Sequence, residues 1–245
     1  MSTRREMLGR IREALGRPPG QPGTPSDLTR TLPELGPVLD PIPPGELVSR
    51  FEEEFVKVGG STHRVGSKSE VGEKLRTILG TGVAQGAVLT RNSLLARLEV
   101  AQALRILGIP AWTWPASEEQ ATPPEEAENY RQRCFAAAAG VTGADWVLAE
   151  TGSLVLSSFH EGSQLASLAP PVHIAFYLRR QVLATLEEVL ERLPAGGPAA
   201  QAPGRSIVFV TGTSRTADIE QIMIRGVHGP RQVHAILVEE SCLAD

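Results

Sequence analysis

Three short segments of this chain carry residue types that bind anions or move protons. The first is a turn with one acid and several small donors, Glu150-Thr151-Gly152-Ser153. Glu150 could act as a base or a nucleophile, and the amides and hydroxyls of Thr151, Gly152 and Ser153 are donors that suit an anion. Because open α/β sheets bind ligands beyond the carboxyl ends of their strands, we expect this turn to border a cleft. An ordinary tight turn with one solvated acid would show the same residues.

The second segment is a loop of small hydroxyl residues after an apolar stretch. It contains Gly212, Thr213, Ser214 and Arg215 and follows the predicted strand Ser206–Val210. Free amides at a helix start, together with an arginine, favour a cradle for phosphate or carboxylate. The segment is neither a Walker loop nor a dinucleotide-binding glycine motif. The acids Asp218 and Glu220 offer an alternative, in which they cap the helix and hold Arg215.

The third segment places a histidine between glycines, in Gly226-Val227-His228-Gly229-Pro230. His228 there suits proton transfer or a hydrogen bond to a substrate, and Gly229 is expected to be among the ligand-binding residues. A turn in which His228 is incidental is the alternative. His160 and Glu161 follow the predicted strand Ser153–Ser157 and could line the same cleft. No Gly-x-Ser-x-Gly elbow supports a serine hydrolase.

The elements that must position these segments alternate between helix and strand after Gly45. This alternation predicts an α/β fold for residues 46–245, with a largely parallel sheet and helices on both faces. The predicted helices are Glu46–Val58, Ser67–Leu79, Leu94–Leu107, Pro123–Ala139 and Ala175–Leu193. The predicted strands are Thr62–Val65, Gly86–Thr90, Pro110–Trp114, Asp145–Ala149, Ser153–Ser157, Ser206–Val210 and Val233–Glu239, of which Ser206–Val210 reads as buried on both sides of the sheet.

Residues 1–45 form a separate N-terminal region in this interpretation. A helix is predicted over residues 2–16, where Met7, Ile11 and Leu15 share one face. Nine prolines fall between Pro18 and Pro44, which predicts an extended arm because proline removes backbone donors. The arm either docks on a partner or is an unpacked terminus.

Composition excludes several classes of protein. The formal net charge is −4, from 24 basic and 28 acidic residues, so we expect no nucleic-acid partner. No apolar run approaches the roughly 18 residues of a membrane-spanning helix, and no signal sequence is evident, so we expect a cytoplasmic protein without membrane insertion. Two cysteines cannot ligate an iron–sulfur cluster, and the histidines lack metal-ligand spacing, so no metal or cofactor is expected.

The three segments, in their order and spacing, resemble the LUD-domain family. The resemblance rests on residues 150–153, 211–220 and 226–230 and extends over about residues 46–240. It implies a fold similar to the superfamily of sugar-phosphate isomerases and CoA-transferases. It also implies a subunit of an L-lactate utilization system that oxidises L-lactate to pyruvate together with iron–sulfur partner proteins, and a cleft for a small anionic ligand.

Two other functions remain open from the sequence. One is an independent enzyme that acts on a small phosphorylated or CoA-linked acid, with Glu150 as base or acyl acceptor. The other is a non-catalytic assembly module. We expect Glu150, Ser214, Arg215 and His228 to converge on one cleft at the carboxyl edge of the sheet. Glu150 and His228 would be its catalytic residues. The other donors named above would bind the ligand.

Overall fold

The computed structural model describes residues 4–14, 41–115, 123–192, 206–216, 224–226 and 228–243. The chain divides into two compact units, Met1–Pro41 and Ile42–Asp245. The first unit contains helix α1 (Arg4–Ala14), which confirms the helix predicted there. Most of the proline-rich arm, residues 15–40, lies outside the described residues, as do Asp218 and Glu220.

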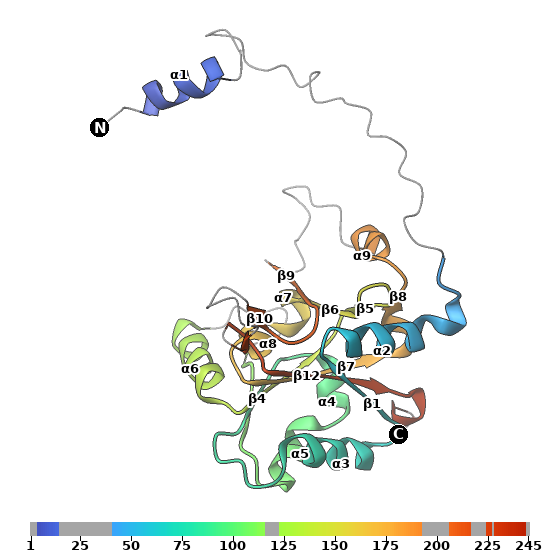
Figure 1. Ribbon diagram of the computed structural model, residues 1–245. Helices are drawn as coiled ribbons and strands as arrows, with labels where there is room; N and C mark the ends of the chain where they lie inside the picture. The colour runs from blue at the N-terminus through green and yellow to red at the C-terminus, as the bar shows by residue number, and fades with distance from the viewer. Residues whose placement is uncertain are drawn as a thin grey trace. The chain divides into compact units, whose positions relative to one another are not determined.

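A six-stranded parallel sheet forms the centre of the second unit, and this confirms the predicted α/β class (Figure 1). The strand order is β1-β12-β7-β4-β2-β3, and every neighbouring pair is parallel. The strands are β1 (Ser61–Val65), β2 (Ala87–Leu89), β3 (Ala111–Thr113), β4 (Ala139–Gly143), β7 (Val172–Leu178) and β12 (Gln232–Val238).

Both faces of this sheet are buried, because successive strand residues enter different hydrophobic clusters. On β7, Ile174 and Phe176 join one cluster, whereas Ala175 and Tyr177 join another. The first cluster contains residues of α3 (Lys68–Leu79), α4 (Ser93–Arg97) and α5 (Val100–Ile106), which lie on one side of the sheet (Figure 1). The second contains residues of α2 (Leu47–Lys57) and of a smaller sheet on the other side. The layers are therefore helix, sheet, then helix with sheet.

The smaller sheet has four strands in the order β8-β5-β6-β9. Its strands are β5 (Trp146–Leu148), β6 (Ser153–Ser157), β8 (Val182–Leu183) and β9 (Ile207–Val210). β6 is antiparallel to both β5 and β9, and β5 is parallel to β8. Strands β5 and β6, with α7 (Ser158–Glu161) and α8 (Leu165–Leu168), lie in the connection between β4 and β7, whereas β8 and β9 follow β7 in the chain.

Shorter elements complete the described part of the chain. They are the single turns η2 (Pro44–Glu46), η3 (Arg179–Gln181) and η4 (Glu240–Leu243), the helices α6 (Pro124–Ala136) and α9 (Leu186–Arg192), and the two-stranded ribbon of β10 (Arg215–Thr216) and β11 (Ile224–Arg225). None of the helices in the described ranges has the length and apolarity that crossing a membrane requires.

The predicted helix Ala175–Leu193 is wrong except over Leu186–Arg192. The chain there forms the end of β7, the turn η3, β8 and α9. Ile174 through Leu178 are all buried, because β7 lies in the middle of a sheet that is covered on both faces. Such a strand is apolar at every position, and periodicity cannot then separate it from a buried helix.

One predicted strand needs correction, and one strand was missed. β9 does not lie in the parallel sheet. It pairs with β6 of the smaller sheet, and its Phe209 is 42% exposed. β4 was not predicted, because its residues, Ala139-Gly140-Val141-Thr142-Gly143, are mostly poor strand formers, and the helix expected over Pro123–Ala139 ended at its first residue. Close packing explains the small residues, since a Cβ on Gly140 would lie 1.7 Å from the carbonyl oxygen of Ala166 in α8.

This contact predicts opposite effects for two glycine-to-alanine substitutions. Gly140→Ala should destabilise the fold by about 3 kcal/mol, because the backbone of α8 must move away from β4. Gly72→Ala in α3 meets no atom within 4 Å and should stabilise the fold by about 0.5–1 kcal/mol, since alanine is the better helix former. Urea denaturation of both variants measures the two values. Equal effects at the two positions would contradict the packing argument.

Candidate functional site

The carboxyl ends of β2 and β4 meet where the direction of strand connection reverses. β2 continues through α4 and α5 to β3 on one side, whereas β4 continues through the smaller sheet to β7 on the other. Open parallel sheets bind their ligands at such a point. A pocket of about 250 Å³ opens here, which we call the carboxyl-edge pocket. Its polar lining includes Asn92, Arg97, Asp145, His160, Arg180 and Gln181.

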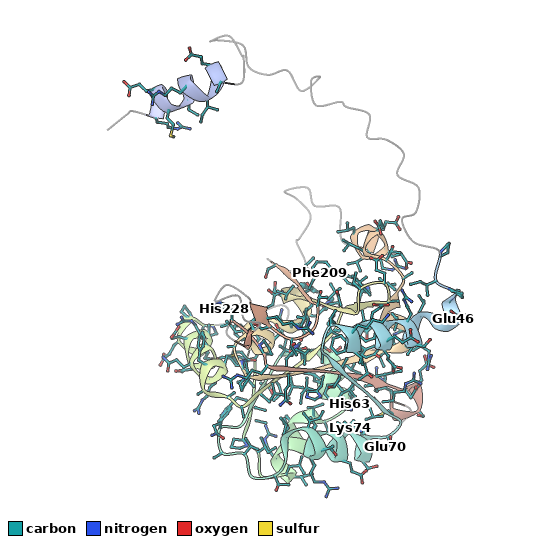
Figure 2. All side chains as sticks on the ribbon, in the orientation of Figure 1. Glu46, His63, Glu70, Lys74, Phe209 and His228 are labelled. Atoms are coloured by element: carbon teal, nitrogen blue, oxygen red, sulfur yellow. The ribbon has the colours of Figure 1, made fainter. Side chains whose placement is uncertain are left out.

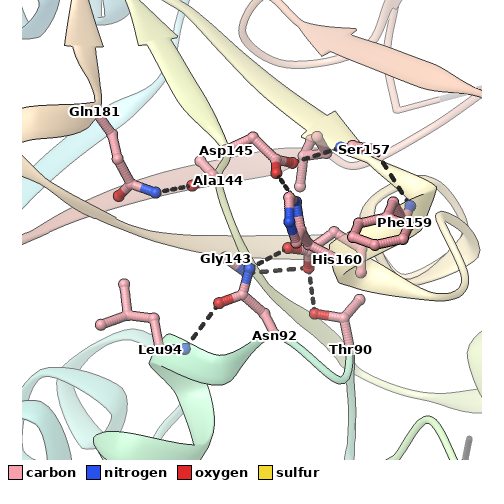
Figure 3. Close-up of polar contacts among 12 residues, drawn as sticks. Thr90, Asn92, Leu94, Gly143, Ala144, Asp145, Ser157, Phe159, His160 and Gln181 are labelled. Carbon is pink, nitrogen blue, oxygen red and sulfur yellow. Dashed lines mark hydrogen bonds and ion pairs between the residues drawn. The ribbon is translucent and has the colours of Figure 1, made fainter. Parts of the chain in front are cut away.

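A buried carboxyl group joins the two strand ends beside this pocket, and Figure 3 labels its partners Thr90, Asn92 and Gly143. Glu161, the last residue of α7, is 0% exposed. Its Oε1 accepts a hydrogen bond from the side-chain amide of Asn92, and its Oε2 accepts from the hydroxyl of Thr90. The backbone N–H of Gly143 donates to Oε2 at 3.1 Å. Thr90 and Asn92 follow β2 and Gly143 ends β4, so one carboxylate holds both strands.

The surroundings of Glu161 bring its titration close to neutral pH. Burial raises the pKa of this carboxyl to about 7, the hydrogen bonds from Thr90 and Asn92 oppose the rise, and the charge of Asp145 adds to it. A carboxyl with this pKa is present in both protonation states in the neutral range. Carboxyl groups shifted in this way occur often at functional sites.

Asp145 and His160 form a second polar pair at the pocket (Figure 3). Oδ1 of Asp145 contacts Nδ1 of His160, and Oδ2 accepts from the backbone N–H of Ser157 at 2.6 Å. An ionised carboxylate only accepts, so Nδ1 donates, and the neutral ring then carries its lone pair at Nε2. The side chain of Asp145 is 5% exposed and that of His160 is 47% exposed. A buried acid therefore orients a histidine that ligands can reach, which is the arrangement of a general base.

Two amide side chains fix the walls of the pocket. Oδ1 of Asn92 accepts from the backbone N–H of Leu94 at 2.9 Å, which caps α4 and sets the orientation of the amide. Gln181 donates to the carbonyl of Ala144 at 2.6 Å and accepts from the N–H of Leu178 at 2.7 Å. Gln181 thereby ties the segment before Asp145 to the end of β7.

Two exposed arginines give the pocket its positive charge. Arg97 comes from the end of α4 and Arg180 from η3. A guanidinium binds a carboxylate or a phosphate through two parallel hydrogen bonds, so these side chains favour an anionic ligand. Within the described ranges, no three His, Cys, Asp or Glu side chains gather closely enough to hold a metal ion.

The segments that sequence analysis singled out lie together elsewhere. The hydroxyl of Thr151 is 2.8 Å from that of Ser153, which is 2.7 Å from that of Thr211. These contacts join the first segment to the second. In the second segment, Nε of Arg215 donates to the hydroxyl of Thr213 at 3.5 Å.

The second segment also contacts the third. The backbone N–H of Ser214 donates to the carbonyl of Pro230 at 3.0 Å, and a Cβ on Gly229 would lie 3.2 Å from that of Ser214. His228 is exposed. We call this group the amino-edge cluster; it comprises Thr151, Gly152, Ser153, Thr211, Gly212, Thr213, Ser214, Arg215, His228 and Gly229.

The amino-edge cluster lies at the opposite edge of the parallel sheet from the pocket. A Cβ on Gly212 would be 2.1 Å from the carbonyl oxygen of Val58, which precedes β1, and Pro230 precedes β12. Strand β6 links the two places, since Ser153 begins it and Ser157 ends it about 13 Å away. Figure 2 shows His228 on the side of the molecule where β12 begins.

The expected position of Glu150 is therefore corrected. Its turn does not lie at the carboxyl edge of the parallel sheet, because it joins β5 and β6, which are antiparallel strands of the smaller sheet. Oε1 of Glu150 accepts from the backbone N–H of Leu186 at 2.7 Å, at the start of α9. The proposed roles of Glu150 and His228 in catalysis stay predictions.

Sequence reasoning found part of the carboxyl-edge pocket. His160 and Glu161 were candidates for the cleft of the Glu150 turn; His160 instead lines this separate pocket, and Glu161 is bonded to its wall through Asn92. Asn92 was missed, although it comes two residues after the predicted strand Gly86–Thr90, where ligand-binding residues of such sheets occur. Asp145 was assigned to the start of a strand, because the strand before it, β4, was not predicted.

The raised pKa of Glu161 predicts a pH dependence of stability. The unfolded chain ionises this carboxyl near pH 4.5 and the folded protein near 7, so the folded state binds more protons between these values. Its contribution to the free energy of unfolding should therefore fall by about 3 kcal/mol as the pH rises from 4.5 to 7. Denaturation of the wild type and of Glu161→Gln at pH 5 and pH 8 isolates this change. Glu53→Gln, at an exposed position of α2, is the control, and a Glu161→Gln difference that does not vary with pH would contradict the prediction.

Comparison with known proteins identifies the family of this chain. Residues 48–238 match the family model of the LUD domain. The chain is 28% identical over 204 residues to lactate utilization protein C of Deinococcus radiodurans, covering 82% of this chain and 84% of that protein. It is 32% identical over 115 residues to lactate utilization protein C of Halalkalibacterium halodurans, where the match covers 47% of this chain and only 50% of that protein.

A solved structure shows the same fold. It is the crystal structure of a DUF162 family protein from Deinococcus radiodurans, with a TM-score of 0.54 and 22% identity, covering 81% of this chain and 99% of that one. The family model spans the six-stranded sheet, the carboxyl-edge pocket and the amino-edge cluster together. The chain belongs to the LUD domain family.

Proposed function

We propose that this protein is a cytoplasmic subunit of an L-lactate utilization system and that the carboxyl-edge pocket binds its small anionic ligand. The names of the Deinococcus radiodurans and Halalkalibacterium halodurans relatives support the biological role. The observation that carries the ligand site is the pairing of Arg97 and Arg180 with an Asp145-oriented histidine in one pocket of about 250 Å³.

This set of side chains suits a small 2-hydroxy or 2-oxo acid. The carboxylate of such a ligand can form paired hydrogen bonds with a guanidinium of the pocket. Its hydroxyl or carbonyl oxygen then meets His160 or the amide of Asn92, which are a proton acceptor and a donor respectively. Lactate and pyruvate differ only at this oxygen and its carbon, so one pocket can hold either.

The electrons of lactate oxidation would leave through partner proteins. Conversion of a 2-hydroxy acid to a 2-oxo acid releases two electrons and two protons. The protein has two cysteines, Cys134 and Cys242, and both are buried, so it cannot supply the four thiolates of an iron–sulfur cluster. We propose that iron–sulfur proteins accept the electrons while this chain binds and orients the acid.

Arginine variants test where the ligand binds. Arg180→Ala should weaken the binding of L-lactate or pyruvate by roughly 1.5–3 kcal/mol, because a hydrogen bond to a charged group is lost. Arg105→Ala, on the exposed surface of α5, is the matched control and should leave affinity unchanged. Isothermal titration calorimetry measures each. Loss of binding in Arg215→Ala but not in Arg180→Ala would assign the ligand to the amino-edge cluster instead.

Ligand choice and co-purification test the function itself. L-lactate or pyruvate should raise the melting temperature more than CoA esters or sugar phosphates do, because the pocket suits a small acid. The tagged protein, expressed from its own host, should co-purify with proteins that absorb near 400 nm. A thermal shift with sugar phosphates or CoA esters alone, without cluster-bearing partners, would favour the independent enzyme.

A further inference from the structure

The hydrogen bonds around Glu161 can all form only with an ionised carboxylate. Asn92 donates to Oε1, and Thr90 and Gly143 donate to Oε2. A glutamine at this position would turn its NH₂ group either toward the Asn92 amide or toward the Gly143 N–H, and each is a donor. Both oxygens must therefore be acceptors, which a glutamine cannot provide.

A proton added to Glu161 has a hydrogen-bond acceptor beside it. A proton on Oε2 can be donated to the hydroxyl oxygen of Thr90, whose own proton then turns to the carbonyl of Val141, 3.5 Å away. A protonated carboxyl oxygen is a weaker acceptor, so the bond from the Gly143 N–H weakens in that state. The neutral form of Glu161 is thus tolerated, but it weakens the side-chain link between the ends of β2 and β4.

The hydrogen bond between Glu161 and Asn92 also sets the position of Asn92 against β4. A Cβ on Gly143 would lie 2.2 Å from Nδ2 of Asn92, so the amide packs directly on the strand backbone. Glu161 holds the NH₂ group of this amide, and the N–H of Leu94 holds its oxygen. Asn92 lines the pocket, and Asp145 follows Gly143 by two residues. A change at Glu161 therefore reaches Asn92 through one hydrogen bond, and it reaches Asp145 through the bond to Gly143 and two residues of backbone.

A buried charge lowers the stability of the fold, so a purely structural link between two strands does not require one. Burial opposes the ionised form of Glu161, and apolar residues of similar volume would fill such a site at less expense in stability. The charged groups that face it do little to offset this, because Asp145 repels it and Tyr130 of α6 stays neutral beside it. Arg91 contacts the backbone of Glu161, because its N–H donates to the carbonyl of Glu161 at 3.3 Å, but its guanidinium donates to the carbonyl of Phe159.

We propose that Glu161 is a positioning residue of the carboxyl-edge pocket, and that its ionised carboxylate holds Asn92 and Gly143 in the arrangement that binds the small acid. Protonation of Glu161 loosens this arrangement and weakens binding. The inference rests on the proposed function for the identity of the ligand, but not for the link between Glu161 and the pocket walls.

Nuclear magnetic resonance tests that link without a ligand. In the full chain, the Asn92 side-chain amide and the Gly143 backbone amide should shift together as the pH crosses about 7, and Glu161→Gln should abolish the shift. Thr90→Val removes one donor to the carboxylate and should raise the midpoint, which keeps the test open if Glu161→Gln folds poorly. The exposed amide of Asn129 is the internal control.

Binding of L-lactate tests the consequence for the pocket. Its affinity for the wild type should fall about tenfold between pH 8 and pH 6, following the fraction of ionised Glu161. Simple attraction between the pocket cations and an anion would change affinity in the opposite direction, since protonation adds positive charge. Glu161→Gln should bind weakly at both values, without this pH dependence.

The amide titration and the binding measurement distinguish a failure of the positioning role from a failure of the proposed function. If the two amides titrate together but neither L-lactate nor pyruvate binds, the proposed function is wrong and the positioning role stands. If the amides do not titrate near pH 7, the positioning role is overturned. Binding of L-lactate to the wild type with equal affinity at both pH values overturns it as well.

Discussion

The structure around the carboxyl-edge pocket depends on one requirement, that a buried carboxylate must find enough hydrogen-bond donors. Glu161 meets it with donors from residues that follow β2 and from the last residue of β4. These two strands pair through their backbones as far as the N–H of Thr90, which donates to the carbonyl of Val141 at 3.0 Å. Beyond that pair, the carboxylate joins Asn92 to Gly143, and it does so at the point where a parallel sheet offers a ligand site.

The smaller sheet positions the polar groups at both edges of the parallel sheet. It packs through Val147, Leu154 and Leu156 against α2 and the second face of the parallel sheet. This packing fixes β6, and β6 presents α7 and Glu161 to the strand ends. The same strand carries Ser153 of the amino-edge cluster at its other end. The hydrophobic contacts of one layer thus place polar groups at both edges of the parallel sheet.

The sequence predicted the class of fold better than the position of the site. Helix–strand alternation after Gly45 and the three motifs indicated an α/β fold of this family, because these patterns depend on local spacing. The strands β4 and β7 were missed, since one consists of small residues and the other is apolar on both faces. Because β4 was not predicted, the turn at Glu150 was placed at the carboxyl edge of the parallel sheet, where the end of β4 lies. The partners of Glu161 could not be predicted, because Thr90 and Asn92 precede it by 71 and 69 residues.

These long separations along the chain bear on how the protein folds. Contacts between distant residues require the closure of long loops, and they form slowly for that reason. Parallel strands add to this, because each needs a crossover before it can pair. The pocket walls come together only when β2, β4 and the insertion that carries α7 are all in place. Binding competence should therefore be among the last properties that a newly made chain acquires, well after its helices have formed.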